Sequence, residues 1–260
     1  MTGTGMRTHA ISSDIKRALT GRGFLVGVVG MVLVIGLSQM ESIIQAARST
    51  TPLLNGYHAQ LILTALSADW VTLAIPILCS LPFTAAFVDD VKSSYIKPYL
   101  HRAGLKRYIR GKLTACGLSG GLVLLFGILI TYGLAALIFS PAELALAKEE
   151  TAQPYLAKVL LASFTLFLSG ALWSLVGFTF AALTMSKYMA YASPFIIYYV
   201  LIILHERYFE KLYVLYPKEW LFPSDFWVMG SFGVMLLLAE LIGIVALAFA
   251  VAAKRRLAHV

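Results

Sequence analysis

Long apolar runs alternate with short polar segments along most of this chain of 260 residues. A helix needs about 20 apolar residues to cross a hydrocarbon core about 30 Å thick. The pattern therefore predicts an all-α integral membrane protein with one domain, 1–260, and six transmembrane helices. The predicted helices cover residues 24–40, 61–88, 113–139, 157–185, 189–204 and 226–252.

The polar segments beside these runs predict further helices. Residues 8–23 place apolar and basic side chains at helical spacing, so we expect an interfacial helix on the cytoplasmic membrane surface, with Lys16, Arg17 and Arg22 toward headgroups. Residues 205–226 are too aromatic for a free loop and too charged to span a bilayer. They predict short re-entrant or interfacial helices between the fifth and sixth spans.

Two of the six runs depart from an ideal span. The run at 61–88 contains Pro76 and Pro82, and membrane helices tolerate proline, so we expect a kinked helix rather than a broken one. The run at 189–204 has only 16 residues, which reach about 24 Å at about 1.5 Å per residue. This helix should end early or lean on the segment after it.

Composition agrees with a bilayer setting. The chain is 59% hydrophobic and 13% charged, with a mean hydropathy of +0.81, whereas soluble domains are about a quarter charged. The net charge is +8, and the basic residues lie beside the apolar runs. This position favours anionic lipid headgroups over nucleic acid as the partner. Cys79 and Cys116 both fall in apolar runs and are expected to behave as small hydrophobes.

The basic residues also predict the orientation. With both termini in the cytoplasm, 15 of the 21 Lys and Arg residues lie on the cytoplasmic side and six lie outside. Positive charge accumulates on the cytoplasmic side of membrane proteins. Residues 87–112 carry seven of these charges between two apolar runs, so 89–112 is predicted to be the main cytoplasmic segment of a multi-pass protein of the cytoplasmic membrane.

Several catalytic motifs are nearly present but incomplete. Gly104 and Gly111 are separated by six residues where a phosphate loop needs four, so we expect no ATP, and no other cofactor, to bind this chain. His205-Glu206 lacks the second histidine of a zinc helix, and no metal site is predicted. The chain is therefore not expected to be an enzyme.

Gly117 to Gly120, with sequence GLSG, resembles the serine motif of rhomboid intramembrane proteases, and this is one alternative function. A serine nucleophile needs a base within hydrogen-bond reach, and all five histidines lie outside the predicted spans. Close helix packing is the simpler role for Gly117, Gly120 and Gly121.

Glu240 lies in the middle of the last apolar run. An intramembrane carboxylate is costly and by default marks a functional position facing the bundle interior or a wet cavity. Two roles stay open, a structural carboxyl that is hydrogen-bonded or a place on a substrate path. Trp173 and Tyr198 are further candidates for the same path, although aromatic residues at such positions more often pack between helices.

The layout resembles the permease subunit of type-2 ABC exporters. In that family the second helix ends in a Phe followed three residues later by an acidic residue, then a Leu, then a basic helix that leads to a Gly-Lys pair. Here these positions are Phe87, Asp90, Leu100 and Gly111-Lys112. The family often has Glu where Asp90 stands.

The resemblance implies a mechanism. Two copies of a separate cytoplasmic ATPase subunit, which would hold ATP and Mg²⁺, are expected to work with this chain and a second permease, identical or homologous, to export an amphiphilic cargo such as a peptide, a lipid-linked molecule or a drug. A membrane scaffold without transport is the other alternative. The residues expected to couple to the ATPase are Phe87, Asp90, Val91, Tyr95, Ile96, Tyr99 and Leu100.

Overall fold

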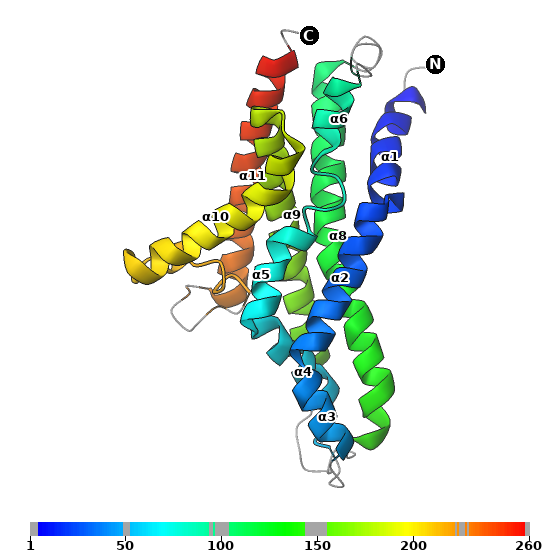
Figure 1. The fold of residues 1–260 in the computed structure, drawn as a ribbon, viewed down its shortest axis with the longest axis vertical. Helices are drawn as coiled ribbons and strands as arrows, with labels where there is room; N and C mark the ends of the chain where they lie inside the picture. Colours follow the sequence, from blue (N-terminus) through cyan, green and yellow to red (C-terminus); the bar gives the residue numbers. More distant parts are fainter. Residues whose placement is uncertain are drawn as a thin grey trace.

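The computed structural model describes residues 5–48, 53–93, 96, 104–143, 155–221, 223, 227 and 229–257, and their regular elements are all helical. The helices run mostly along one axis (Figure 1). The beginning of α1 (Gly5–Thr20) and the end of α11 (Gly230–Leu257) lie at the same end of the bundle. We call this the terminal end and the opposite one the distal end.

Four helices are long and apolar enough to cross a membrane. They are α8 (Leu105–Phe139), α9 (Tyr155–Thr184), α10 (Lys187–Arg207) and α11. Two bent helix pairs raise the number of candidate spans to six if each pair counts as one. The chain is thus an all-α protein with the architecture of a multi-pass membrane protein.

The first bent pair covers the residues of the predicted interfacial helix and first span. α1 is followed by α2 (Arg22–Ser38), and the two axes differ by 49° at Gly21. A further short helix, α3 (Met40–Arg48), extends toward the distal end and was not predicted.

The predicted single helix over 61–88 is wrong, because the chain breaks there. α4 (Tyr57–Ser67) and α5 (Asp69–Leu78) meet at 73°, turns follow, and α6 (Ala86–Lys92) begins beyond Pro82. Pro76 stays inside α5, as expected for a tolerated proline. The break between α4 and α5 lies at Ala68 and not at a proline. The backbone of Ala68 is extended, which ends α4, although its N–H still donates to the Ala65 carbonyl.

α9 is the most buried span and forms the centre of the fold. It packs closely along α8, where a Cβ added to Gly120 would lie 2.5 Å from the Ser174 Cβ and one added to Gly170 would lie 2.7 Å from the Gly120 carbonyl oxygen. The predicted packing role of the small residues near Ser119 is therefore confirmed for Gly120.

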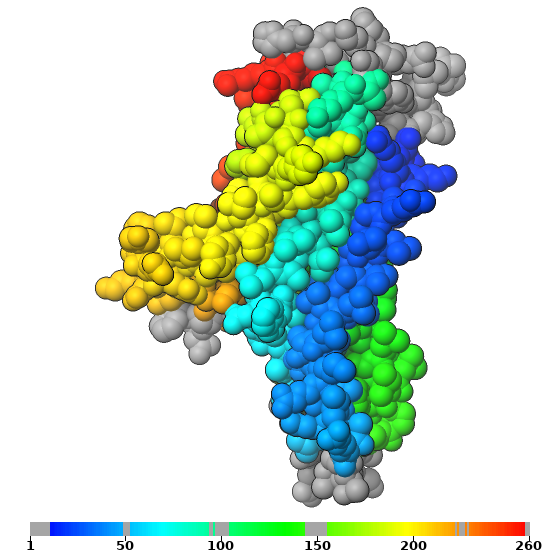
Figure 2. All heavy atoms as spheres, viewed as in Figure 1, coloured from blue at the N-terminus to red at the C-terminus, as the bar shows by residue number. Residues whose placement is uncertain are grey.

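α10 leaves the bundle as an arm that projects to one side (Figures 1 and 2). It has 21 residues rather than the predicted 16, about 31 Å, so its length alone matches the thickness of a bilayer core. Within 208–221 the chain forms turns and one short 3₁₀ helix, η2 (Tyr213–Leu215). The predicted pair of short helices is absent from that described part.

Candidate functional site

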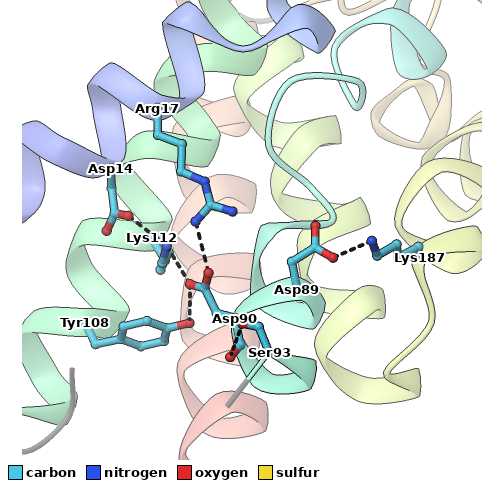
Figure 3. A network of polar contacts seen from close by, with 8 residues as sticks. All are labelled: Asp14, Arg17, Asp89, Asp90, Ser93, Tyr108, Lys112 and Lys187. Atoms are coloured by element: carbon cyan, nitrogen blue, oxygen red, sulfur yellow. Dashed lines mark hydrogen bonds and ion pairs between the residues drawn. The ribbon is translucent and has the colours of Figure 1, made fainter. Parts of the chain in front are cut away.

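The carboxylate of Asp90 is the centre of a buried polar network at the terminal end (Figure 3). Arg17 Nη1 donates a hydrogen bond to Asp90 Oδ1 at 3.0 Å, and the Tyr108 hydroxyl donates to Oδ2 at 3.1 Å. Lys112 Nζ lies 2.7 Å from the same Oδ2. Asp90 is only 3% exposed, so these three donors replace the water that it loses on folding.

Lys112 joins this carboxylate to a second one. Its Nζ also donates to Asp14 Oδ1 at 2.7 Å, and its side chain is 3% exposed. The four charged side chains of the network, from Asp14, Arg17, Asp90 and Lys112, sum to zero. Burial of charge is tolerated only with such pairing, and the network therefore fixes α1, α6 and α8 to one another.

Helical spacing explains how the network is assembled. Asp14 and Arg17 are three residues apart on α1, and Tyr108 and Lys112 are four apart on α8, so each pair shares one helix face. Gly111 lets the two helices approach, because a Cβ there would lie 3.2 Å from Asp14 Oδ2. That oxygen has no hydrogen-bond partner in the described part of the chain.

An aromatic cluster supports the network from within the protein. The Phe87 ring is fully buried, with ring centroids of Phe249, Phe178 and Tyr108 at 5.6, 6.3 and 6.5 Å. Phe178 on α9 and Phe249 on α11 stack at 4.3 Å. Burial of such a ring is worth about 1.5–3 kcal/mol, so Phe87 anchors α6 to two spanning helices.

α6 also has a link on its other side. Asp89, the neighbour of Asp90, forms an ion pair with Lys187 at the start of α10 (Figure 3). One short helix of seven residues therefore contacts α1 and α8 through Asp90, and the α10 arm through Asp89. α6 is thus linked by polar contacts to three other helices.

The structure places the remaining predicted coupling residues as follows. Val91 is half-buried, and Ile96 is fully buried in the same apolar cluster as Phe87. Ile96 therefore belongs to the protein's own core and does not contribute to an open docking face. Tyr95, Tyr99 and Leu100 lie outside the described residues.

Two of the three predicted path residues meet. The rings of Trp173 and Tyr198 lie edge to face at 5.3 Å, and Trp220 stacks on Trp173 at 5.9 Å. Trp173 is 2% exposed, and its indole N–H has no hydrogen-bond partner among the described residues. Glu240 is not part of this group, because its side chain lies on the exposed side of α11.

Ser119 has no catalytic partner among the described residues. Its hydroxyl is buried and donates to the Cys116 carbonyl at 3.1 Å, and none of the described hydrogen bonds joins it to a histidine. Among the described residues, no group of His, Cys, Asp or Glu side chains has a geometry that could hold a metal ion.

A second polar cluster at the distal end was missed by the sequence analysis. Glu143 accepts hydrogen bonds from the backbone N–H groups of His58 at 2.8 Å and Gly56 at 2.9 Å, at the start of α4. The His58 ring Nδ1 lies 2.7 Å from the same carboxylate. Burial raises the pKa of Glu143, but these hydrogen bonds from His58 and Gly56 outweigh it and lower the pKa overall.

The sequence analysis also missed Asp14 and Tyr108 and expected Arg17 at lipid headgroups. The structure instead pairs Arg17 with Asp90, although half of the Arg17 side chain stays exposed. The available signal was an acidic residue, Asp14, on the apolar side of an otherwise basic helix.

A scan against protein-family models and a search of curated proteins gave no match to this chain.

Proposed function

We propose that the chain is the permease subunit of an ATP-driven exporter that works with a separate cytoplasmic ATPase. One observation carries the proposal. Phe87, Asp90, Gly111 and Lys112, the residues on which the resemblance to type-2 ABC permeases rests, gather around one buried network. A loop that only set topology would not need a buried carboxylate shared by three donors.

The contacts of α6 suggest how the ATPase would act. Two ATPase copies that close on ATP, with Mg²⁺ held in the ATPase, push against the cytoplasmic segment that contains α6. The buried side of α6 is fixed to α1 and α8 through Asp90, and its exposed side is paired with Lys187 of α10. The displacement is thus transmitted to α10, the helix that carries Tyr198.

The proposed orientation places the terminal end in the cytoplasm. Lys254, Arg255 and Arg256 at the end of α11 lie there, as does the network around Asp90. Trp173 and Tyr198 are the proposed contacts for an amphiphilic cargo in a state in which α10 has moved away from α9, because both side chains are only 2% exposed in this structure. An aromatic pair with an indole N–H that has no partner among the described residues suits a molecule with an apolar body and a hydrogen-bond acceptor.

The test is co-purification of the tagged full-length chain from its own membranes in mild detergent, followed by ATP hydrolysis measurements on the recovered complex in proteoliposomes. We expect an ATPase subunit in the complex, and a fall of at least tenfold in its hydrolysis rate with Asp90→Asn. Asp69→Asn is the matched control. Asp69 also pairs with a lysine at 2.7 Å, but it is the first residue of α5 and its side chain is exposed.

The control should stay within about twofold of the unmodified complex. Equal yields and gel-filtration profiles for both variants establish that they fold. Recovery without any ATP-hydrolysing subunit, or an Asp90→Asn complex that hydrolyses ATP at the unmodified rate, overturns the proposal. A stable complex that hydrolyses no ATP and moves no cargo would identify the scaffold alternative instead.

A further inference from the structure

Glu240 is the only charged residue in the middle parts of the four long spans. No Lys, Arg or Asp and no other Glu occurs in these parts, which are residues 113–142, 159–184, 188–204 and 230–253. Glu240 is the eleventh residue of α11, about 15 Å from the start of that helix and about 21 Å from Lys254 near its end, at about 1.5 Å per residue. In a membrane this position lies deep in the hydrocarbon core.

The carboxyl group of Glu240 has no partner in the described part of the chain. Its side chain is exposed, and no hydrogen bond or ion pair joins it to another described residue. α11 is the least buried of the four long spans, so this side chain faces the surroundings of the bundle. A carboxylate in hydrocarbon needs a compensating charge, and the middle parts of the long spans supply none. A cation from outside the chain is therefore the complement of this position.

The side chains around Glu240 form an apolar surface with a gap beside the carboxyl group. A Cβ built on Gly243 would meet no atom within 4 Å. Gly243 follows Glu240 by three residues and is therefore its neighbour on the helix surface. Larger apolar side chains, all well exposed, border the gap on the same side of α11. We call this surface the Glu240 face, and it comprises Leu236, Glu240, Gly243, Ile244 and Leu247.

The composition of the Glu240 face selects the kind of cation. Ca²⁺ and Mg²⁺ take about six or more oxygen ligands. This face offers the two oxygens of a single carboxyl group, and its other side chains are apolar. A metal ion would thus lack most of its ligands, whereas an organic cation with an apolar body needs only one counter-ion and buries its body against the leucine and isoleucine side chains.

We infer that the Glu240 face binds a lipophilic organic cation from the surrounding lipid, with its charged centre at the Glu240 carboxylate and its apolar groups over Gly243 and Ile244. The bound pair is the same whichever form Glu240 takes beforehand. A carboxylate pairs with the cation directly, and a carboxylic acid does so by releasing its proton to water. Binding needs no ATPase, so the site is tested apart from the proposed function, for which a lipophilic cation would be one class of amphiphilic cargo.

The test is equilibrium binding of radiolabelled tetraphenylphosphonium to the purified full-length chain in dodecyl maltoside. The phenyl groups of this cation surround its charge, so it enters hydrocarbon readily. We expect saturable binding to the unmodified chain. Tetraphenylborate has the same shape and the opposite charge, and it should not displace the bound cation because Glu240 would repel it.

Two substitutions separate the proposed site from uptake into the detergent micelle. Glu240→Gln removes the charge and should lower the affinity for tetraphenylphosphonium about tenfold or more. Gly243→Leu should lower it about fivefold by filling the gap while Glu240 stays in place. The matched control is Glu41→Gln on α3, because Glu41 is also exposed but lies outside the predicted spans, and this variant should stay within about twofold of the unmodified chain.

Gel filtration of each variant in the same detergent checks that the chain is folded. The inference is overturned if the unmodified chain shows no saturable binding, if Glu240→Gln binds as tightly as the unmodified chain, or if Gly243→Leu leaves the affinity unchanged. Displacement by tetraphenylborate overturns it as well. Recruitment of an ATPase is measured in a different experiment, so failure of this inference and failure of the proposed function are distinct results.

Discussion

Replacement of Lys112 with methionine is the most direct test of the buried network. Lys112 Nζ lies 2.7 Å from both Asp14 Oδ1 and Asp90 Oδ2 and is almost completely buried. Methionine keeps most of the length and volume of the side chain and removes only the charge. The variant Lys112→Met therefore leaves two buried carboxylates with a single cation, Arg17, which contacts only Asp90.

The cost follows from what is left behind. Removal of one partner from a buried pair costs about 3–5 kcal/mol, because the other charge stays buried without compensation. The chain contains a matched exposed pair, in which Lys218 Nζ lies 2.7 Å from Asp69 Oδ1 with 72% of the Asp69 side chain exposed. Exposed pairs contribute about 0–1 kcal/mol. The N–O distances are the same, but loss of the lysine charge is expected to cost far more stability at the buried Lys112 than at the Lys218 pair.

The assay is equilibrium unfolding of the purified chain in dodecyl maltoside micelles titrated with sodium dodecyl sulfate, followed by circular dichroism. We expect Lys112→Met to lower the free energy of unfolding by about 3–5 kcal/mol and Lys218→Met by about 1 kcal/mol or less. The double variant Lys112→Met with Asp14→Asn should recover part of the loss, since it removes the excess carboxylate. Equal losses for the two lysine variants would refute the reasoning.

Two further predictions concern the distal cluster and the α8–α9 contact. Because the folded pKa of Glu143 is lowered, its contribution to stability is present above the ordinary pKa of about 4.3 and disappears as pH falls through the lowered pKa, and Glu143→Gln should abolish this part of the pH dependence of thermal unfolding. Gly120→Ala should cost about 1–3 kcal/mol of unfolding free energy because its Cβ would meet Ser174, whereas Gly133→Ala, with open space, should be neutral or stabilising.

The long helices were predictable because each coincides with one apolar run in the sequence. α8, α9 and α11 end within a few residues of the predicted limits apart from the start of α8, which continues through the basic residues 105–112. The second run was not predictable in the same way. The run from Leu61 to Val88 contains one charged residue, Asp69, which stands directly after the break at Ala68, whereas the break before α6 depends on how neighbouring helices satisfy the freed backbone groups.

The network around Asp90 was half predictable. Its members on either side of the charged segment, Asp90 and Lys112, stand in a short motif, so their importance can be inferred from spacing. Arg17 lies 73 residues from Asp90 in the chain, and a count of basic residues assigns it to headgroups like any other. Only the bend at Gly21 and the approach of α1 to α8 decide that it pairs inward.

Asp90 and Glu240 show why a carboxylate beside apolar sequence is an ambiguous signal. Both are acidic residues next to strongly apolar stretches, but Asp90 was singled out by its place in the motif of the resemblance and Glu240 by its position inside an apolar run. Asp90 finds three donors within the chain, so its burial is compensated and its role is to hold helices together. Glu240 has no donor among the described residues, and its side chain is exposed on α11. The number of donors inside the fold therefore separates a carboxylate that links helices from one that does not.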